Sequence, residues 1–227
     1  MVLAASPREA TQLGHLGAVE ADVDGAHSYN AVITKRESLQ MTSSTRGGTR
    51  LFPIWLALDQ VIDPQNLGAI LRTAHFLHID GVVLTEHETA PFSSTVSKAS
   101  AGAMEVMDLF VTSSLPKFLE ESAQNGWHIY GTDIHSPRTI LISEYLREKH
   151  RQSDGVPALV SSPTIIVLGS EGKGMRVAVS KACHNHLLLG DDDDSDAQGN
   201  VAREAYRVDS LNVSVAAGIL LHTLVTG

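Results

Sequence analysis

The sequence predicts an α/β fold with a mostly parallel sheet and helices on both faces of that sheet. From about residue 51 onward, short apolar runs typical of buried strands alternate with segments of helical periodicity. Strands that alternate with helices are typical of parallel sheets covered on both sides. The hydrophobic fraction, 43% of 227 residues, is large enough for the core that such a fold needs.

The first strand and the helix after it have the clearest boundary. Residues 54–61 (IWLALDQV) are predicted as a strand, which the segment DPQN then ends. A helix is predicted from Pro64 to Leu77, since proline suits the first helical position and Asp63 can cap the helix. Its apolar residues repeat at intervals of three and four, so one face is directed to the core. They are Leu67, Ile70, Leu71, Ala74 and Leu77.

The remaining elements continue this alternation. The further predicted strands are 81–85, 106–111, 127–131, 164–169 and 186–190, of which 164–169 (TIIVLG) is the clearest. The further predicted helices are 93–100, 115–124, 175–182 and a last helix that follows the polar start of 209–221 (DSLNVSVAAGILL). Residues 133–162 form a polar insertion with a predicted helix at 142–151.

Residues 1–50 differ in composition from the rest of the chain. They are rich in Ser, Thr, Gly and Ala, and 42–50 (TSSTRGGTR) has the composition of a linker. The sequence therefore predicts a linker and a domain remnant over 1–50, followed by one folded domain over 51–227.

Charge and cysteine content limit the functional classes. The net charge of −9 opposes nucleic acid binding, although five aspartates (191–194 and 196) fall in one run that is typical of a solvated loop. A single cysteine excludes an intrachain disulfide and suits a reducing compartment. No apolar run reaches the ~18 residues of a membrane span. No targeting segment is visible in residues 1–20.

Three polar clusters lie where a ligand would bind. They are DPQNLGAILR (63–72), GSEGKGMR (169–176) and DSLN (209–212). In open α/β sheets ligands bind beyond the carboxyl ends of the strands, so we expect these clusters to form the site. The middle cluster is neither a P-loop nor a dinucleotide fingerprint, because no Ser or Thr follows Lys173 and Val177 stands in place of the third glycine.

Together the three clusters resemble the three motifs of the SpoU/TrmH family of RNA ribose 2′-O-methyltransferases, within the SPOUT superfamily. The matching stretches are DPQNLGAILRTA (63–74), IIVLGSEGKGM (165–175) and DSLNVSVAAGILL (209–221), and SKASAGA (97–103) is similar to the family as well. The resemblance covers 51–227 and is closest to mitochondrial large-subunit rRNA methyltransferases and their guanosine-methylating bacterial relatives.

This resemblance implies a fold, a cofactor and a substrate. It implies a deep trefoil knot at the C-terminus, S-adenosyl-L-methionine bound in that knot, and a homodimer formed through the knot and the last helix. The implied activity is 2′-O-methylation of a ribose in structured RNA, most closely a guanosine of large-subunit rRNA in mitochondria. Residues 27–35 (HSYNAVITK) resemble the end of a substrate-binding domain that precedes the catalytic domain in many relatives.

The resemblance also implies roles for single residues. The resemblance makes Arg72 a general base, but an arginine side chain is rarely deprotonated in proteins. Its expected role is therefore to hold an RNA phosphate and to stabilise the developing alkoxide. Gly68, one helical turn earlier, has no side chain and is therefore expected to leave the path of the Arg72 side chain toward the cleft open. The other implied catalytic residues are Asn66, Glu171, Ser210 and Asn212. The implied cofactor-binding residues are Thr132, Gly169, Leu189 and Leu211, and no metal site is expected.

Several alternatives stay open at this point. Ser210 could serve only as the cap of the last helix, with Asn212 in its first turn. Lys98, Lys173 and Arg176 are candidates for RNA contacts. The chain could also be a catalytically silent RNA-binding or ribosome-assembly factor on the same fold, or a tRNA 2′-O-methyltransferase. A plain nucleotide-binding α/β protein is disfavoured by the failed glycine spacings.

Overall fold

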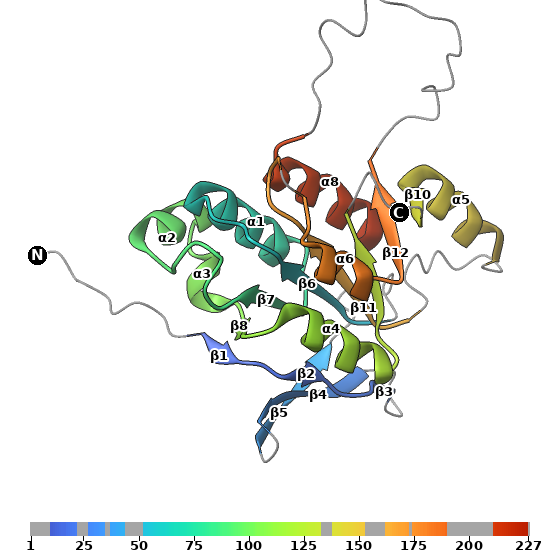
Figure 1. Cartoon of the computed structure of the whole chain (residues 1–227), viewed down its shortest axis with the longest axis horizontal. Helices are drawn as coiled ribbons and strands as arrows, with labels where there is room; N and C mark the ends of the chain where they lie inside the picture. Colours follow the sequence, from blue (N-terminus) through green and yellow to red (C-terminus); the bar gives the residue numbers. More distant parts are fainter. Residues whose placement is uncertain are drawn as a thin grey trace, which may run out of the picture.

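The computed structural model describes residues 10–21, 27–34, 37–43, 52–132, 138–152, 162–172, 174–189 and 211–226. Its centre is an eight-stranded sheet (Figure 1). In order across the sheet, the strands are β1 (Thr11–Gln12), β8 (Leu109–Thr112), β7 (Gly81–Thr85), β6 (Ile54–Leu58), β11 (Thr164–Leu168), β9 (His128–Gly131), β12 (Asn185–Leu188) and β10 (Thr139–Leu141). Every pair of neighbours is parallel, which confirms the predicted α/β class.

Helices connect the strands and end the chain. They are α1 (Pro64–Phe76), α2 (Ser94–Ser100), α3 (Ala103–Val106), α4 (Leu115–Gln124), α5 (Ile142–Gln152), α6 (Val177–Ala182) and α8 (Val213–Thr226). The predicted cap of the first helix is confirmed, because the Asp63 side chain accepts a hydrogen bond of 2.8 Å from the Gln65 N–H.

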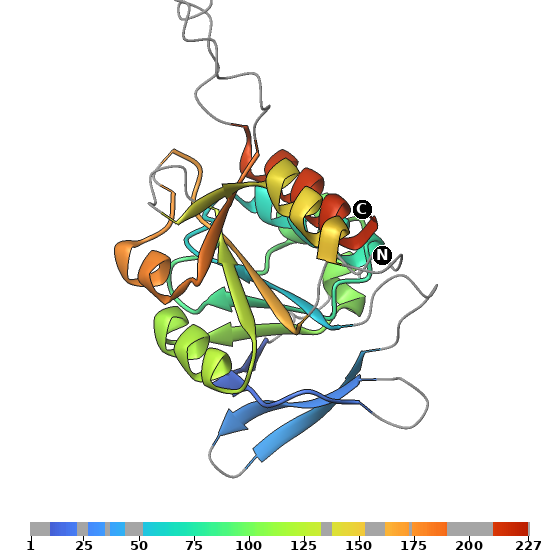
Figure 2. The ribbon, with the colours of Figure 1, turned by 90° about the vertical axis from the view of Figure 1, so that its right-hand side faces the viewer.

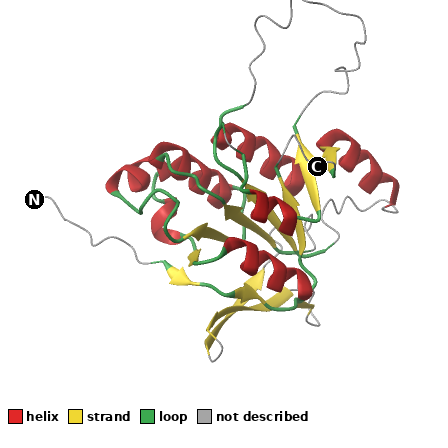
Figure 3. Ribbon diagram, in the orientation of Figure 1, coloured by secondary structure: helices red, strands yellow, loops and turns green. Residues whose placement is uncertain are grey.

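Helices cover both faces of the sheet, as predicted (Figures 2 and 3). The pleat of β6 separates two cores, since Ile54, Leu56 and Leu58 face one side while Trp55 and Ala57 face the other. The first core includes α1, α8 and the start of α5. The second includes α4, α6 and apolar residues from the N-terminal segment.

The N-terminal segment contains a small antiparallel sheet of β2 (His15–Leu16), β4 (His27–Thr34) and β3 (Glu20–Ala21), with β5 (Glu37–Ser43) paired to β4. It lies beside α4 (Figure 2), and the Trp127 indole donates a 2.8 Å hydrogen bond to the Gly17 carbonyl. Residues 27–34 and 37–43 are therefore strands, and most of the stretch with linker composition, 44–50, lies outside the described residues. The relation to a substrate-binding domain stays a prediction.

Two short elements differ from the prediction. The strand expected at 106–111 begins only at Leu109, because Gly102, with a φ of +94°, starts the short helix α3 before it. Strand β10 lies inside the polar insertion and was not predicted, because polar residues flank its short apolar run. It pairs with β12 at the edge of the sheet. The segment 190–210, which includes the aspartate run and would thread the expected knot, lies outside the described residues.

Within the described ranges, none of the helices has the length and apolar character required to cross a membrane.

Candidate functional site

The sheet order brings the first two motifs side by side. Strands β6 and β11 are adjacent and parallel, with Leu58 in register with Leu168, so α1 and the loop 169–176 both start at the same edge. The third motif reaches this edge through α8, which packs along α1 in the first core. The three polar clusters therefore meet at the carboxyl ends of the strands, as predicted.

One predicted residue from each motif takes part in a single hydrogen-bond network. The Asn66 amide Nδ2 donates to Glu171 Oε2 at 3.0 Å, and Asn212 Nδ2 donates to Asn66 Oδ1 at 3.0 Å. Asn212 Nδ2 also lies 3.5 Å from both carboxylate oxygens of Glu171. Asn66 is buried while Glu171 is exposed, so the network runs from the core to the surface.

Asn212 also begins the last helix. Its Oδ1 accepts hydrogen bonds from the Ser214 N–H at 2.9 Å and from the Ser214 hydroxyl at 2.6 Å, which is the pattern of an N-cap residue. The alternative that placed Asn212 within the first turn is therefore wrong. Ser214 was missed, although the spacing Asn-x-Ser at a helix start could have indicated it. Ser210 lies outside the described residues.

The loop of the second motif is a tight turn. Ser170 and Gly174 exchange two backbone hydrogen bonds of 3.0 Å, which places Glu171 and Gly172 at the tip. A Cβ atom on Gly169 would lie 2.4 Å from the Gly174 carbonyl carbon and 2.5 Å from the Met175 nitrogen. Gly169 is therefore required by the loop itself, because the returning backbone fills the space of a side chain.

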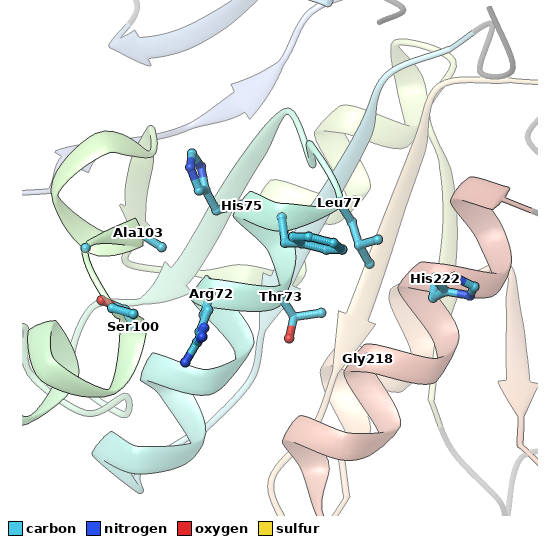
Figure 4. A pocket seen from close by; sticks show the side chains of 11 residues that line it. Arg72, Thr73, His75, Leu77, Ser100, Ala103, Gly218 and His222 are labelled. Carbon is cyan, nitrogen blue, oxygen red and sulfur yellow. The ribbon is translucent and has the colours of Figure 1, made fainter. Parts of the chain in front are cut away.

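Arg72 lies apart from this network, in a pocket of about 590 Å³ between α1, the α2–α3 turn and α8. Figure 4 shows its side chain between Ser100 on one side and Gly218 on the other. Within the described part of the chain, no hydrogen bond or ion pair engages its guanidinium, which is exposed. None of the described residues that line the pocket is acidic, so no carboxylate among them would compete with an anion for Arg72.

Gly68 has a packing role that the sequence did not indicate. A Cβ atom there would lie 2.4 Å from the Ala99 Cβ and 2.9 Å from the Ser100 nitrogen. Gly68 therefore allows α2 to pack closely on α1, and its expected effect on the Arg72 side chain stays a prediction.

The four expected cofactor-binding residues occupy neighbouring loops. Three of them directly follow a strand: Gly169 follows β11, Thr132 follows β9 and Leu189 follows β12. These three strands are adjacent in the sheet. The Thr132 hydroxyl donates to the Val167 carbonyl at 3.2 Å, Leu189 is half-buried, and Leu211 is 48% exposed. Beneath them, burial raises the pKa of Tyr130, whose hydroxyl donates to Tyr145 of α5.

The expected RNA contact of Arg176 is not supported by the structure. Its guanidinium forms an ion pair with Asp59 at 2.7 Å and with Glu88, so its charge is already neutralised. Lys98 is exposed on α2, and Lys173 lies outside the described residues. Among the described residues, no group of three or more His, Cys, Asp and Glu side chains is placed to hold a metal ion.

Comparisons with known proteins agree on one family. Residues 53–190 match the model of the SpoU rRNA methylase family. The chain is 40% identical over 179 residues to the human protein named mitochondrial rRNA methyltransferase 1, with 75% of this chain and 45% of that protein covered. It is 35% identical over 169 residues to the 23S rRNA (guanosine-2′-O-)-methyltransferase RlmB of Pseudomonas aeruginosa, with 74% and 57% covered. The chain thus spans about half the length of these relatives.

A solved structure shows the same fold. An AdoMet-bound rRNA methyltransferase from Sinorhizobium meliloti superposes with a TM-score of 0.56 at 24% identity. The superposition covers 76% of this chain and 55% of that protein.

Proposed function

The chain belongs to the SpoU rRNA methylase family, and we propose on this basis that it transfers a methyl group from S-adenosylmethionine to a ribose 2′-hydroxyl of structured RNA. The proposed substrate is a guanosine of large-subunit rRNA, and the proposed compartment is the mitochondrion. The names of the human and Pseudomonas relatives support both assignments.

The observation that carries the proposal is the network of Asn66, Glu171 and Asn212. These residues come from three motifs separated by 105 and 41 positions along the chain, yet their side chains bond one another at one sheet edge. A silent RNA-binding factor would not need such a network, because RNA contacts can come from surface cations alone. We therefore place catalysis ahead of binding alone.

The loop residues fit S-adenosylmethionine as a ligand. Thr132, Gly169, Leu189 and Leu211 would hold it, since they combine backbone at the strand ends with the exposed apolar side chain of Leu211. When bound, this group supplies a methyl on a sulfonium, which is the electrophile that an alcohol oxygen can attack. The apolar side chains would enclose an adenine, while the loop backbone would supply hydrogen bonds.

Arg72 would act on the nucleophile. Its exposed guanidinium has planar donors that match a phosphate and an alkoxide oxygen, and its positive charge would stabilise negative charge on the 2′-oxygen as the proton leaves. Glu171, Asn66 and Asn212 would hold the reacting ribose or fix the loops around it. Ser210 is assigned with them by its place in the third motif.

A homodimer and a trefoil knot complete the proposal. Val215, Gly218, Ile219 and His222 share one face of α8 at helical spacing, and Val215 and Ile219 are 49% and 43% exposed. Phe76 of α1, which is 78% exposed, lines the Arg72 pocket together with Gly218 and His222. A second copy would cover this apolar face and close the pocket. The return of Asn212 to the loop 169–176 after β12 supports the knot.

The proposal is tested with the purified chain in two steps. Calorimetry with S-adenosylmethionine measures cofactor binding, and methyl transfer from a labelled donor onto transcribed large-subunit rRNA or tRNA identifies the substrate. Mapping of 2′-O-methyl groups at single-nucleotide resolution then locates the product. Label on tRNA alone would favour the tRNA enzyme. Binding of RNA without any transfer would favour the silent factor and contradict the proposal.

A further inference from the structure

We propose that Asp59 and Arg176 are a positioning pair that fixes the loop 169–176 and thereby orients Glu171 toward Asn66 and Asn212. This inference rests on the proposed function, because the orientation of Glu171 matters to the reaction only if that site is the catalytic one. Neither residue is among the expected catalytic or cofactor-binding residues, and the RNA contact expected of Arg176 is replaced by its ion pair with Asp59.

The Asp59 carboxylate is fully buried and is bound by Arg176. Asp59 follows β6, and its own N–H donates to the Leu168 carbonyl at 2.8 Å, so it lies beside the end of β11. Its Oδ2 accepts the Arg176 backbone N–H at 2.9 Å, and its Oδ1 accepts Arg176 Nε at 2.8 Å and lies 2.7 Å from Nη2. A buried carboxylate that receives several charge-assisted hydrogen bonds tolerates little displacement of its partner.

Arg176 transmits this constraint to the loop. The loop leaves β11 at Gly169 and closes on itself through the Ser170–Gly174 backbone bonds, with a further 3.2 Å bond from the Ser170 hydroxyl to the Gly174 carbonyl. Arg176 comes two residues after Gly174 and directly precedes α6. Both ends of the loop are therefore fixed at adjacent strands. Glu171 at the tip is exposed, and among the described residues its hydrogen-bond partners are the amides of Asn66 and Asn212.

A second acid contacts the same guanidinium from the solvent side. Glu88, in the segment after β7, forms an ion pair with Arg176 Nη1, and the Glu88 side chain is 43% exposed. An exposed ion pair contributes little to rigidity, because water competes for both charges. Glu88 therefore offers a matched control: Glu88→Gln and Asp59→Asn each remove one carboxylate charge from Arg176, but only the second affects the buried contact.

The test compares hydrogen exchange of peptides covering residues 169–176 in the wild type, Asp59→Asn and Glu88→Gln, without cofactor. We expect exchange to be ~10-fold faster in Asp59→Asn, because loss of the ion pair with Arg176 allows the loop to open locally. We expect exchange to be nearly unchanged in Glu88→Gln. The Kd for S-adenosylmethionine should rise ~10-fold or more in Asp59→Asn only, the scale of one lost charge-assisted bond. Equal exchange in all three proteins would overturn the inference.

A double variant separates positioning from general stability. Asp59→Asn/Arg176→Met leaves no unpaired buried charge, and the Asn oxygen can still accept the backbone N–H of residue 176. We expect a Tm close to that of the wild type, with fast loop exchange and slow methyl transfer. Wild-type exchange and cofactor affinity in this variant would overturn the inference. If the wild type itself binds no S-adenosylmethionine, the proposed function fails, while the exchange data still decide whether the pair fixes the loop.

Discussion

Arg72 offers the sharpest test at the scale of single residues. Since its guanidinium is exposed in a pocket apart from the four cofactor-loop residues, Arg72→Ala should leave the Kd for S-adenosylmethionine nearly unchanged. Methyl transfer at saturating RNA and cofactor should fall by ~10²-fold or more, the scale for losing one preorganised charge at a reacting oxygen. Arg72→Lys should restore little, because a point charge does not replace a planar fork of donors.

Lys117→Ala is the control for this loss of charge. Lys117 is 70% exposed on α4, which covers the opposite face of the sheet, so methyl transfer should be unaffected. If Arg72→Ala turned over RNA at the wild-type rate, Arg72 would be an ordinary solvated helix residue.

Asn66 provides a second prediction, with a defined pH dependence. In the wild type, Asn66 Nδ2 lies 3.0 Å from Glu171 Oε2. Asn66→Asp replaces this donor with an acceptor oxygen that faces the same Oε2. Two carboxylates this close raise the pKa of one of them, so they bond only when they share a proton. The free energy of unfolding should fall by about 1–3 kcal/mol at high pH, and this deficit should shrink as the pH is lowered through the raised pKa.

Denaturant titrations at pH ~8 and pH ~5 measure whether the deficit shrinks as the pH is lowered. Gln65→Glu is the control, since it adds the same charge at the exposed neighbouring position. A constant deficit at both pH values would show that the two side chains do not share a proton.

The sequence predicted which residues would gather, but not which atoms would bond. Asn66, Glu171 and Asn212 meet because the strand order fixes where their loops start, and that order follows from alternating strands and helices. The partnership of Arg176 with Asp59 spans 117 positions and depends on the final course of the loop backbone, which no local pattern encodes. The need for positive surface near the motifs suggested RNA as the partner of Arg176, but the structure pairs Arg176 with the buried carboxylate of Asp59 instead.

At the scale of elements, the packing of α1 on α2 depends on Gly68. Gly68→Ala places a methyl 2.4 Å from the Ala99 Cβ and 2.9 Å from backbone atoms of α2, so the helix must move. The strain of ~1–3 kcal/mol exceeds the gain of up to about 1 kcal/mol in helix propensity, and the variant should be less stable. Because Ser100 of α2 lines the Arg72 pocket, methyl transfer should fall as well.

Gly218→Ala in α8 is the matched control for that substitution. Its Cβ would have Thr73 Cγ2 at 4.0 Å as its nearest neighbour, which is ordinary contact, so the propensity gain of up to about 1 kcal/mol should remain. Urea denaturation of both variants decides the comparison. Two equally stabilised proteins would contradict the close packing of α1 and α2.

Elements with a clear cap or apolar pattern were predictable, and the shortest elements of the large sheet and its helices were not. Helix α1 follows from its cap, its first proline and its apolar face, and it ends within one residue of the expected position. Strand β10 and helix α3 have three and four residues, too few for a periodic pattern, and their neighbours in space determine them. Strand β1, with two residues, exists only because β8 offers an edge.

At the scale of the whole molecule, the N-terminal segment shows the limit of composition as a guide. Its Ser- and Thr-rich sequence is typical of a linker, yet Leu16 and Tyr29 are buried in the second core. The Trp55 indole donates a 2.8 Å hydrogen bond to the Tyr29 hydroxyl, which ties the small sheet to the large one. Contacts between distant parts of the chain, rather than local composition, fold this segment.

The last prediction concerns assembly, which we expect to depend on the apolar face of α8 and α1. One side of α8 is buried in the core of its own chain, through Val213, Ala217, Leu220, Leu221 and Leu224. Contacts among the described residues do not cover the other side. Ile219 and Phe76 remain 43% and 78% exposed on the other side, which is unusual for large apolar groups unless a partner covers them. Light scattering at micromolar concentration should therefore give the mass of a dimer. Phe76→Glu/Ile219→Glu should give a monomer, because two charges would be buried at the interface.

The control for this pair of charges lies on the opposite face of the sheet. Val177 of α6 is 71% exposed, and Val177→Glu should leave the dimer intact. If the Arg72 pocket is completed by the second copy, the monomeric variant should also lose methyl transfer while its fold, measured by circular dichroism, stays unchanged. A wild-type chain with a monomer mass at micromolar concentration would contradict both steps, since the exposed face of α8 would then have no partner.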